Sequence, residues 1–312
     1  MSYRTRLLSI AAGGLLSLSA ALASNAQAQG PDLSPTQKDR VRVEKVEAAA
    51  KLIPADFKFV TPGKLTVASI PGRLPFAVYA NDNKTPVGSE PDIAQLVADS
   101  LGLELELVPI AWADWPLGVT SGRFDAAIHN ITVTEERKQK FDFSTYRNDL
   151  IGFYVPLNSA VQSISKPEDV AGLKVIVSSG TNQEEILLRW SEANKAKGLA
   201  PSEVQYYDDE AVLDVALQSG RADAYLGPNA TSAFKAAQEN KTRQVGTFSG
   251  GWPETAEIAV ATKKGGGLAD AFTTALNAQI ENGNYAKVLA RWNLSAEAIK
   301  QSRTNPQGLP KS

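Results

Sequence analysis

Residues 121–128 read Ser121-Gly122-Arg123-Phe124-Asp125-Ala126-Ala127-Ile128, and residues 219–226 read Ser219-Gly220-Arg221-Ala222-Asp223-Ala224-Tyr225-Leu226. The two segments share the pattern Ser-Gly-Arg-x-Asp-Ala, and each follows a predicted helix and begins a predicted strand. Glycine at the end of a helix is a common stop signal. The copies lie too far apart in the sequence for a solenoid repeat. They therefore predict one βα unit that is used once in each of two similar lobes.

Strand and helix patterns alternate around these two copies. Residues 64–69 predict a buried strand, a helix opens at Asp92 and ends at Gly102, and residues 103–110 predict the next strand. The alternation continues with predicted strands within residues 170–177 and 256–261 and predicted helices at residues 268–280 and 285–292. This order is typical of the α/β class.

Polar residues follow the two strands that the repeated segments begin. They are His129-Asn130 in the first lobe and Gly227-Pro228-Asn229 in the second. In open α/β sheets, ligands lie beyond the carboxyl ends of the strands. Two lobes that present these ends to each other form a cleft, and we expect the ligand in that cleft.

The segment from His129 to Ser144 carries the residues best suited to binding. Thr134-Glu135-Glu136-Arg137 has the pattern of a helix start capped by Thr134, where free N–H groups favour an anion. Arg137 places a cation in that first turn, which is unfavourable unless a negative group faces it. The spacing leaves two partners open, namely the local acid Asp142 and a ligand carboxylate.

A second polar segment, in the second lobe, extends from Ser178 through Gly180 to Glu184. Thr181 and Glu184 have the spacing of a capping box, and the glycine lets backbone approach a bound group closely. A well-capped helix that binds nothing explains the same residues. Both interpretations stay open, and Ser178, Thr181 and Asn182 are the candidate contacts.

The N-terminal residues have the pattern of a secretory signal peptide. Arg4 and Arg6 precede the uncharged run from Leu7 to Ala23, and Ala26-Gln27-Ala28 is a small-x-small cleavage site. We therefore predict that residues 1–28 are removed and that the mature protein is periplasmic. An uncleaved membrane helix is the alternative, and it is disfavoured because glycines and serines interrupt the apolar run.

The composition excludes several kinds of site. The chain has no Cys, and His129 is its single His, which excludes thiolate catalysis, a Cys-ligated metal and a His-rich metal site. The formal net charge of −2 becomes −4 when Arg4 and Arg6 leave with the signal peptide (−2 − 2 = −4). That charge indicates neither nucleic acid nor an anionic membrane as a partner. We expect no cofactor and no metal.

The mature chain is expected to contain two lobes with a simpler segment at each end. Residues 29–62 form an N-terminal extension, in which Val41, Val43, Val46 and Ala49 predict one exposed helix. Lobe 1 is expected at residues 63–150 and again at residues 255–296, with lobe 2 at residues 151–254. Residues 297–312 are polar, with two prolines, and are predicted to be a flexible tail.

Five segments carry a family resemblance: Ser121–Asp125, Asn130–Arg137, Phe141–Ser144, Glu168–Val175 and Ser179–Thr181. Together they resemble the periplasmic solute-binding proteins of ABC importers for polar amino acids, extracellular solute-binding protein family 3. The resemblance covers about residues 63–294. It implies a type II periplasmic binding protein, in which two lobes joined by two hinge strands close on a solute. The hinges are expected near residues 147–152 and 253–257.

The resemblance also implies roles for individual residues. Arg137 would grip the solute's α-carboxylate in a bidentate contact, helped by Thr132 and by backbone near Asn130 and Thr181-Asn182. Trp112 lies where the family commonly has an aromatic residue beside the solute, although a core tryptophan fits the same pattern.

Several positions depart from the family pattern. Pro228 stands where many members carry the acid that meets the solute's α-ammonium group, and proline can neither attract a cation nor donate an N–H. Ile70 and Arg73 stand where an acid or an aromatic residue is frequent, and His129 replaces a small residue. A pocket with Arg73, Arg137 and His129 favours anionic groups and penalises an unpaired ammonium.

The resemblance implies the substrate-binding component of an ABC transporter. We expect a monomer that binds an amino acid or a related carboxylate-bearing solute and delivers it to a membrane permease. The alternative is a periplasmic enzyme on the same fold, similar to dehydratases. Such an enzyme needs a general acid or base in the cleft, for which Glu90, Glu184 and His129 are the candidates. None has a partner at a recognisable catalytic spacing, so we expect no enzymatic activity.

Overall fold

The structure, a computed structural model, describes residues 31–207 and 209–310. The predicted signal peptide, residues 1–28, lies outside these ranges. From Leu33 onward the chain forms one compact unit, which contains two five-stranded sheets and a small two-stranded one, β2 (Val78–Tyr79) with β3 (Pro86–Val87). No helix in the described ranges is long and apolar enough to cross a membrane.

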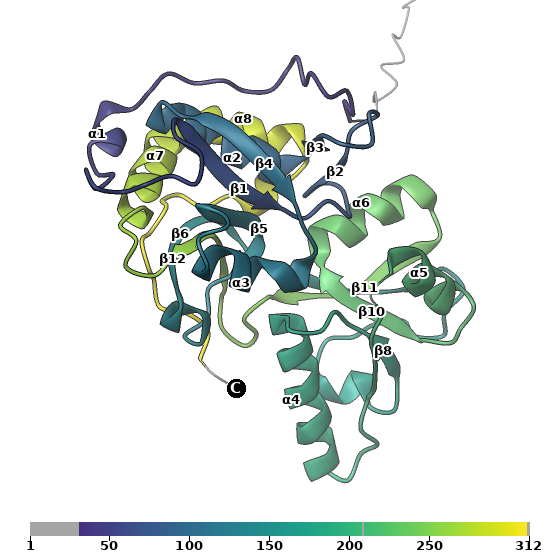
Figure 1. The fold of residues 1–312 in the computed structure, drawn as a ribbon. Coiled ribbons are helices and arrows are strands. Elements are labelled where there is room, and N and C mark those ends of the chain that lie inside the picture. Colours follow the sequence, from purple (N-terminus) through teal and green to yellow (C-terminus); the bar gives the residue numbers. More distant parts are fainter. Residues whose placement is uncertain (1–30, 208, 311–312) are drawn as a thin grey trace, which may run out of the picture. The chain divides into compact units, whose positions relative to one another are not determined.

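The first five-stranded sheet has the strand order β4-β1-β5-β12-β6 (Figure 1). β1 pairs in parallel with β4 and β5, whereas β12 is antiparallel to both β5 and β6. Its strands alternate buried side chains between two cores, so α2, α7 and α8 cover one face and α3 covers the other. The elements of this first lobe are β1 (Lys64–Ser69), α2 (Ser89–Leu101), β4 (Glu104–Pro109), α3 (Trp115–Thr120), β5 (Ala126–Thr132), β6 (Phe141–Asn148), β12 (Glu257–Lys263), α7 (Ala269–Glu281) and α8 (Asn284–Arg291).

The second sheet has the order β11-β7-β10-β8-β9. Along β8 and β10, Val175 and Leu226 face the core under α4, whereas Ile176 and Tyr225 face the core under α5. The elements of this second lobe are β7 (Leu150–Pro156), β8 (Lys174–Ile176), α4 (Asn182–Ala196), β9 (Glu203–Gln205), α5 (Glu210–Gln218), β10 (Ala224–Pro228), α6 (Asn229–Glu239) and β11 (Thr242–Ser249), with the 3-10 turn η3 at Pro167–Val170.

The two sheets are joined where β6 continues into β7 and where β11 leads into β12. Asp149 is the single residue between β6 and β7. Its backbone N–H donates to the carbonyl of Ala256 at 3.0 Å, and its carbonyl accepts from Gly250 at 2.9 Å. These two connections, the hinge crossings, are therefore hydrogen-bonded to each other at Asp149. The result is a two-lobed α/β fold with two hinge strands, as predicted.

The repeated Ser-Gly-Arg-x-Asp-Ala segments occupy equivalent places in the two sheets. The carboxylate of Asp125 accepts from the backbone of Thr66 in β1, and that of Asp223 accepts from the backbone of Lys174 in β8, both at 2.8 Å. In each lobe this bond reaches the parallel neighbour of the strand that the segment begins. The prediction of one βα unit used in each lobe is confirmed.

The helix predicted to start at Thr134 does not form. The hydroxyl of Thr134 does accept from the N–H of Arg137 at 3.1 Å, but only the three-residue 3-10 turn η2 (Arg137–Gln139) follows before β6 begins. The reason is tertiary, because Thr134 and Glu135 pair with Leu309 from the C-terminal segment. Because no helix forms, a helix dipole cannot favour an anion at this position, contrary to what the sequence pattern had suggested.

The N-terminal extension is not the exposed helix that its spacing predicts. Helix α1 spans only Glu47–Ala50, and the chain before it is extended, with Val41, Val43 and Val46 packed against the core of the first lobe. Arg40 pairs with Asp92 at 2.7 Å, and Arg42 makes a two-bond contact with Asp99 at 2.7 and 2.8 Å. These pairs with α2 hold the segment extended, and Val41 and Val43 follow the two-residue period of a strand.

The C-terminal segment was predicted to be a flexible tail, and this is wrong for residues 297–310. Glu297, in the 3-10 turn η4 (Ser295–Glu297), is buried, as are Ser302 and Leu309. The backbones of Arg303 and Asn305 bond to β6, which is otherwise an edge strand of its sheet. Pairing an exposed sheet edge outweighs the polar composition that predicted fraying.

Candidate functional site

Arg137 extends from η2 across the contact between the lobes. Its Nη1 donates to the carbonyl of Thr132 at 2.9 Å, and its Nη2 donates to the carbonyl of Gly180 in the second lobe at 3.1 Å. The guanidinium carbon lies 5.8 Å from the ring centre of Trp112 and 5.9 Å from that of Trp115. Arg137 therefore contacts carbonyl oxygens from both lobes and aromatic faces from the first lobe.

No carboxylate in the described part of the chain lies within ion-pair distance of Arg137. Asp142, the local partner left open by the sequence, instead accepts from the backbone of Gly265 at 2.7 Å and from Asn305 at 3.0 Å. Burial lowers the pKa of Arg137 below its ordinary value, against the more distant charges of Glu185 and Asp149. Asp142 is therefore excluded as the ion-pair partner of Arg137, and no other described carboxylate takes that place.

Thr132, Asp149 and Asn182 form a buried cluster next to Arg137. The hydroxyl of Thr132 lies 2.8 Å from Oδ2 of Asp149 and 3.1 Å from Oδ1 of Asn182. Asn182, the first residue of α4, donates to the same Asp149 oxygen at 2.9 Å and to the carbonyl of Gly250 at 2.6 Å. The first lobe, the hinge and the second lobe thus each contribute one side chain to this cluster.

The segment before α4 is a well-formed cap. The hydroxyl of Thr181 accepts from the N–H of Glu184 at 3.3 Å, and the Glu184 carboxylate accepts from the N–H of Gly180 at 2.6 Å. Ser178 is exposed, and its carbonyl accepts from Thr181 at 2.7 Å. The Thr181 half of the predicted capping box forms, but Glu184 accepts from the N–H of Gly180 instead of that of Thr181. Gly180 also offers its carbonyl to Arg137.

Asn130 and His129 lie in β5, where they contact Arg147 and Phe76. Asn130 has a positive φ of 47°, and its side-chain oxygen accepts from Arg147 at 2.5 Å. The ring of His129 packs edge-on to Phe76 at 6.0 Å, and its Nδ1 is buried with no hydrogen-bond partner in the described chain. Burial, reinforced by the charge of Arg147, lowers the pKa of His129 to about 3. The sequence predicted that His129 would help to attract an anion. A neutral imidazole does not do so.

Arg73 crosses between the lobes at a different place. Its Nη1 donates to the hydroxyl of Tyr225 at 2.6 Å, and its guanidinium pairs with Glu210 at the start of α5. The prediction that Arg73 adds free positive charge to the pocket is wrong, since Glu210 already neutralises it. Pro228 ends β10 and begins α6, where its carbonyl accepts from Thr231 at 3.0 Å.

Two important residues were not predicted from the sequence. Asp149 and Arg147 belong to a hinge that the sequence places only approximately, and a charged residue beside a strand is usually solvated. Arg147 is instead buried, pairs with Glu90 at 3.1 Å and also pairs with Glu297. The run Arg147-Asn148-Asp149 between two apolar strands was the available signal.

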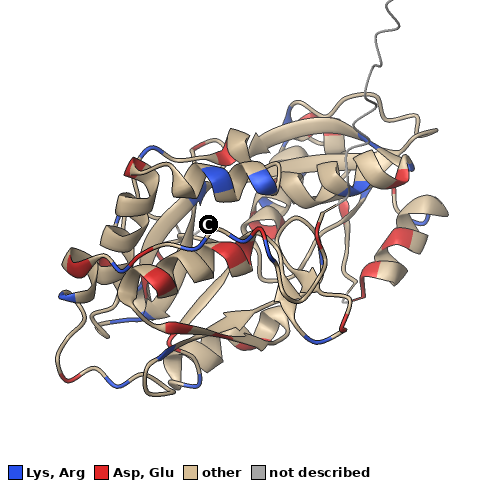
Figure 2. Ribbon diagram, turned by 90° about the horizontal axis from the view of Figure 1, so that it is seen from above, with Lys and Arg blue, Asp and Glu red and all other residues tan. Residues whose placement is uncertain are grey.

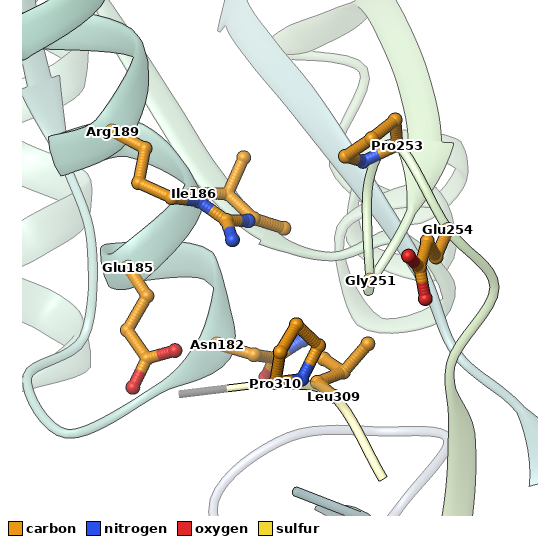
Figure 3. Close-up of a pocket in the computed structure, with 9 residues that line it drawn as sticks. All are labelled: Asn182, Glu185, Ile186, Arg189, Gly251, Pro253, Glu254, Leu309 and Pro310. Atoms are coloured by element: carbon orange, nitrogen blue, oxygen red, sulfur yellow. The ribbon is translucent and has the colours of Figure 1, made fainter. Parts of the chain in front are cut away.

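Two pockets include residues described above, the first Asn182 and the second Arg73. One separates α4 from the second hinge crossing and the C-terminal segment (Figure 3). A larger one surrounds Arg73 and Tyr225 between α5 and α6. Arg137 lines neither of these two pockets. The residues that line the first pocket are Asn182, Glu185, Ile186, Arg189, Gly251, Pro253, Glu254, Leu309 and Pro310.

A protein-family comparison matches residues 65–295 to the bacterial extracellular solute-binding proteins, family 3. The chain belongs to this family. Among curated family 3 relatives, the L-cystine-binding protein TcyJ of Escherichia coli (strain K12) is 30% identical over 220 residues, which cover 70% of this chain and 78% of TcyJ. TcyJ and the arginine-binding protein ArgT of Corynebacterium glutamicum, which is 26% identical over 249 residues, are both binding proteins.

Solved structures agree with the family 3 assignment. The amino acid ABC transporter substrate-binding protein AbpA from Streptococcus pneumoniae, bound to L-arginine, superimposes with a TM-score of 0.62 at 28% identity, covering 75% of this chain and 97% of AbpA. The ancestral amino acid-binding protein AncCDT-1, a precursor of cyclohexadienyl dehydratase, has a TM-score of 0.62 at 24% identity, covering 74% of this chain and 95% of that one, and shows the fold alone. The predicted type II binding-protein fold is confirmed.

Proposed function

We propose that this protein is the substrate-binding component of an ABC importer, which binds an amino acid or a related carboxylate-bearing solute between its lobes and delivers it to a membrane permease. The observation that carries the proposal is Arg137, a cation at the interlobe contact without a carboxylate partner among the described residues. A guanidinium has five N–H donors in a planar fork that matches a carboxylate. A bound carboxylate would supply the missing negative charge.

The lobes and hinges support a mechanism by closure. Arg137 and Thr132 belong to the first lobe and Gly180 and Asn182 to the second, so a solute held by both sets favours the closed arrangement of the lobes. The closed form is then the form that docks on the permease. Acidic and basic residues are interspersed along the chain (Figure 2), which fits a small solute better than a polyanionic partner. Export through a signal peptide at residues 1–28 places the protein in the periplasm, where it acts as a monomer.

The experiment is thermal unfolding of the mature protein with a panel of solutes. The panel contains the twenty protein amino acids, L-cystine, dicarboxylates and other organic acids, beginning with cystine and arginine because relatives bind them. A solute at a hundred times its Kd stabilises the protein by about 2.7 kcal/mol. If no member of the panel raises the unfolding temperature, the proposal is wrong.

Two variants connect binding to Arg137. We expect Arg137→Ala to abolish the stabilisation by solute and to leave the unliganded protein folded. The matched control is Arg221→Ala, which removes an exposed arginine of the second lobe and should leave solute binding intact. An unfolded Arg137→Ala protein would instead assign Arg137 a structural role.

The enzyme alternative has little support from the candidate acids and bases. Glu90 is buried against Arg147 and Tyr146, Glu184 is engaged by Gly180 and Tyr206, and His129 has a pKa of about 3. Both carboxylates are thus engaged by other groups of the chain, and a His129 with that pKa is not protonated near neutral pH. Recovery of the stabilising solute unchanged after prolonged incubation would exclude turnover of that solute.

A further inference from the structure

Asp149 is the buried acidic residue of the cluster that Thr132 and Asn182 form next to Arg137. It lies between β6 and β7, is 2% exposed, and is held by backbone bonds to Gly250 and Ala256 in the other crossing. Its position is therefore set by both hinge strands rather than by either lobe alone. A side chain here stays at the interlobe contact when the lobes move.

The two oxygens of the Asp149 carboxylate have different surroundings. Oδ2 accepts from Thr132 at 2.8 Å and from Asn182 at 2.9 Å. Oδ1 is buried and accepts no hydrogen bond from the described chain. Buried carboxylate oxygens are normally satisfied, because an unsatisfied one carries its full desolvation cost. Oδ1 is therefore suited to accept from a donor that the chain itself does not supply.

Arg137 and Asp149 contact opposite ends of one residue. Arg137 donates to the carbonyl of Thr132 at 2.9 Å, and Asp149 accepts from its hydroxyl at 2.8 Å. The guanidinium of Arg137 and the carboxylate of Asp149 thus lie on either side of Thr132. Each also contacts the second lobe, Arg137 at Gly180 and Asp149 at Asn182. This pair of opposite charges matches a zwitterion, whose own charges are separated by two bonds, better than it matches a dianion.

Of the other charged groups nearby, Arg147 is paired, Glu136 is exposed, and Glu185 of α4 is half-buried and lines the pocket beside Asn182. The partners of Arg147 are Glu90 and Glu297, so it is not free for a solute. Burial raises the pKa of the Asp149 carboxyl above its ordinary value, against the hydrogen bond from Thr132 and the charge of Arg147, and a cation bound at Oδ1 would relieve that cost.

We infer that Asp149 selects the solute, by accepting the ammonium group of a zwitterionic amino acid whose carboxylate is held by Arg137. The inference rests on the proposed function and adds a specificity-determining residue in the hinge. It also explains how Pro228, which offers no charge, is compatible with an amino acid as solute. A carboxylic acid without the ammonium leaves Oδ1 unsatisfied and is rejected.

The test compares pairs of solutes that differ only in the ammonium group. The probes are the twenty protein L-amino acids and L-cystine and, for each one that binds, the same molecule with hydrogen in place of its α-ammonium. Calorimetric titration of the wild-type protein should show the analogue binding about 10- to 100-fold more weakly than the amino acid. This comparison needs no variant, so it stands even if a substitution at Asp149 prevents folding.

The isosteric variant Asp149→Asn assigns that preference to one residue. It should bind the amino acid about 10- to 100-fold more weakly than wild type and bind the analogue as well as wild type does or better. Glu136→Gln removes one exposed charge near Arg137 and is the matched control, in which the preference stays intact.

Three results overturn the inference. The first is equal binding of the amino acid and its analogue by wild type, and the second is an unchanged preference in a folded Asp149→Asn protein. The third is binding of dicarboxylates or other organic acids alone, which leaves the proposed function standing. If nothing in the panel binds, the proposed function fails and the inference fails with it.

Discussion

At the scale of single residues, Arg147 is among the largest fully buried side chains in the described part of the chain. It is buried between the carboxylates of Glu90 and Glu297, with its guanidinium 4.6 Å from the ring centre of Phe76. A buried ion pair adds little net stability, but losing one partner leaves an uncompensated charge away from water. Exposed pairs such as Lys64 with Glu104 lack that cost.

We therefore predict that Arg147→Met lowers the free energy of unfolding by about 3–5 kcal/mol. Urea denaturation of the unliganded protein measures this change. The triple variant Arg147→Met, Glu90→Gln, Glu297→Gln removes the stranded charges and should recover part of the loss. A single variant as stable as wild type would mean that water reaches these carboxylates.

His129 gives a second prediction at this scale, because it is the single His of the chain. Burial lowers its pKa from 6.5 to about 3, so the unfolded chain binds more protons than the folded one between these values. The free energy of unfolding should therefore fall as pH falls through this window, by about 1.4 kcal/mol per pH unit from this group. Above pH 6.5 the contribution of His129 to the free energy of unfolding no longer changes with pH.

Two measurements check the titration of His129. Nuclear magnetic resonance of its imidazole should show no protonation at pH 5, and a titration midpoint near 6.5 would contradict the prediction. The variant His129→Asn cannot titrate, so its stability should depend less steeply on pH than that of wild type. The difference between the two proteins isolates His129 from carboxyl groups that titrate in the same range.

At the scale of elements, the C-terminal segment acts as an additional strand on β6. The N–H of Thr145 donates to Arg303 at 3.1 Å, and that of Asn305 donates to Phe143 at 2.9 Å. Leu309 then exchanges backbone bonds with Val133 and Glu135 at 3.0 and 2.8 Å, next to the turn that carries Arg137. The segment covers a sheet edge and braces the turn that carries Arg137.

Truncation after Lys300 should therefore destabilise the protein by about 3–5 kcal/mol, since several buried backbone bonds are lost at about 1 kcal/mol each. The uncovered β6 edge should also promote aggregation. Chemical denaturation and light scattering measure the two effects. Truncation after Pro310 is the control and should change neither; a stable, monomeric protein ending at Lys300 would show that the segment contributes little.

At the scale of the whole molecule, the lobes touch through polar side chains at two separate places. Arg137 and Asn182 form the inner contact, and Arg73 joins Glu210 and Tyr225 in the outer one. The outer contact is made only when the lobes are together, so it favours the closed state whether or not solute is bound. Its strength changes the population of the closed form rather than the solute contacts.

Glu210→Gln should accordingly weaken solute binding by up to about fivefold, which corresponds to the 0.2–1 kcal/mol of a partly exposed ion pair. Calorimetric titration measures the affinity. The unfolding midpoint of the unliganded protein should stay the same within error. A loss of affinity far beyond fivefold would mean that Glu210 contacts the solute directly.

Much of the framework was predictable from local pattern. The strand at Lys64–Ser69 and the glycine stop at Gly102 follow from periodicity and left-handed backbone, with Gly102 at a φ of 72°. The helix at Thr134 and the flexible tail were wrong for one shared reason, since each segment pairs with the other across the sequence. Local propensity cannot register a partner that lies far away in the chain.

The sequence alone determined the number of lobes, the βα unit that both of them use, and Arg137 as a cation whose partner, Asp142 or a ligand carboxylate, stayed open. These features depend on periodicity, turn residues and spacing, which act over a few residues. Only the tertiary structure decided that Asp142 is engaged elsewhere, that Arg73 is neutralised by Glu210, and that Asp149 lies opposite Arg137 across Thr132. Charge pairing depends on distances between side chains from different elements, and those distances exist only once the chain has folded.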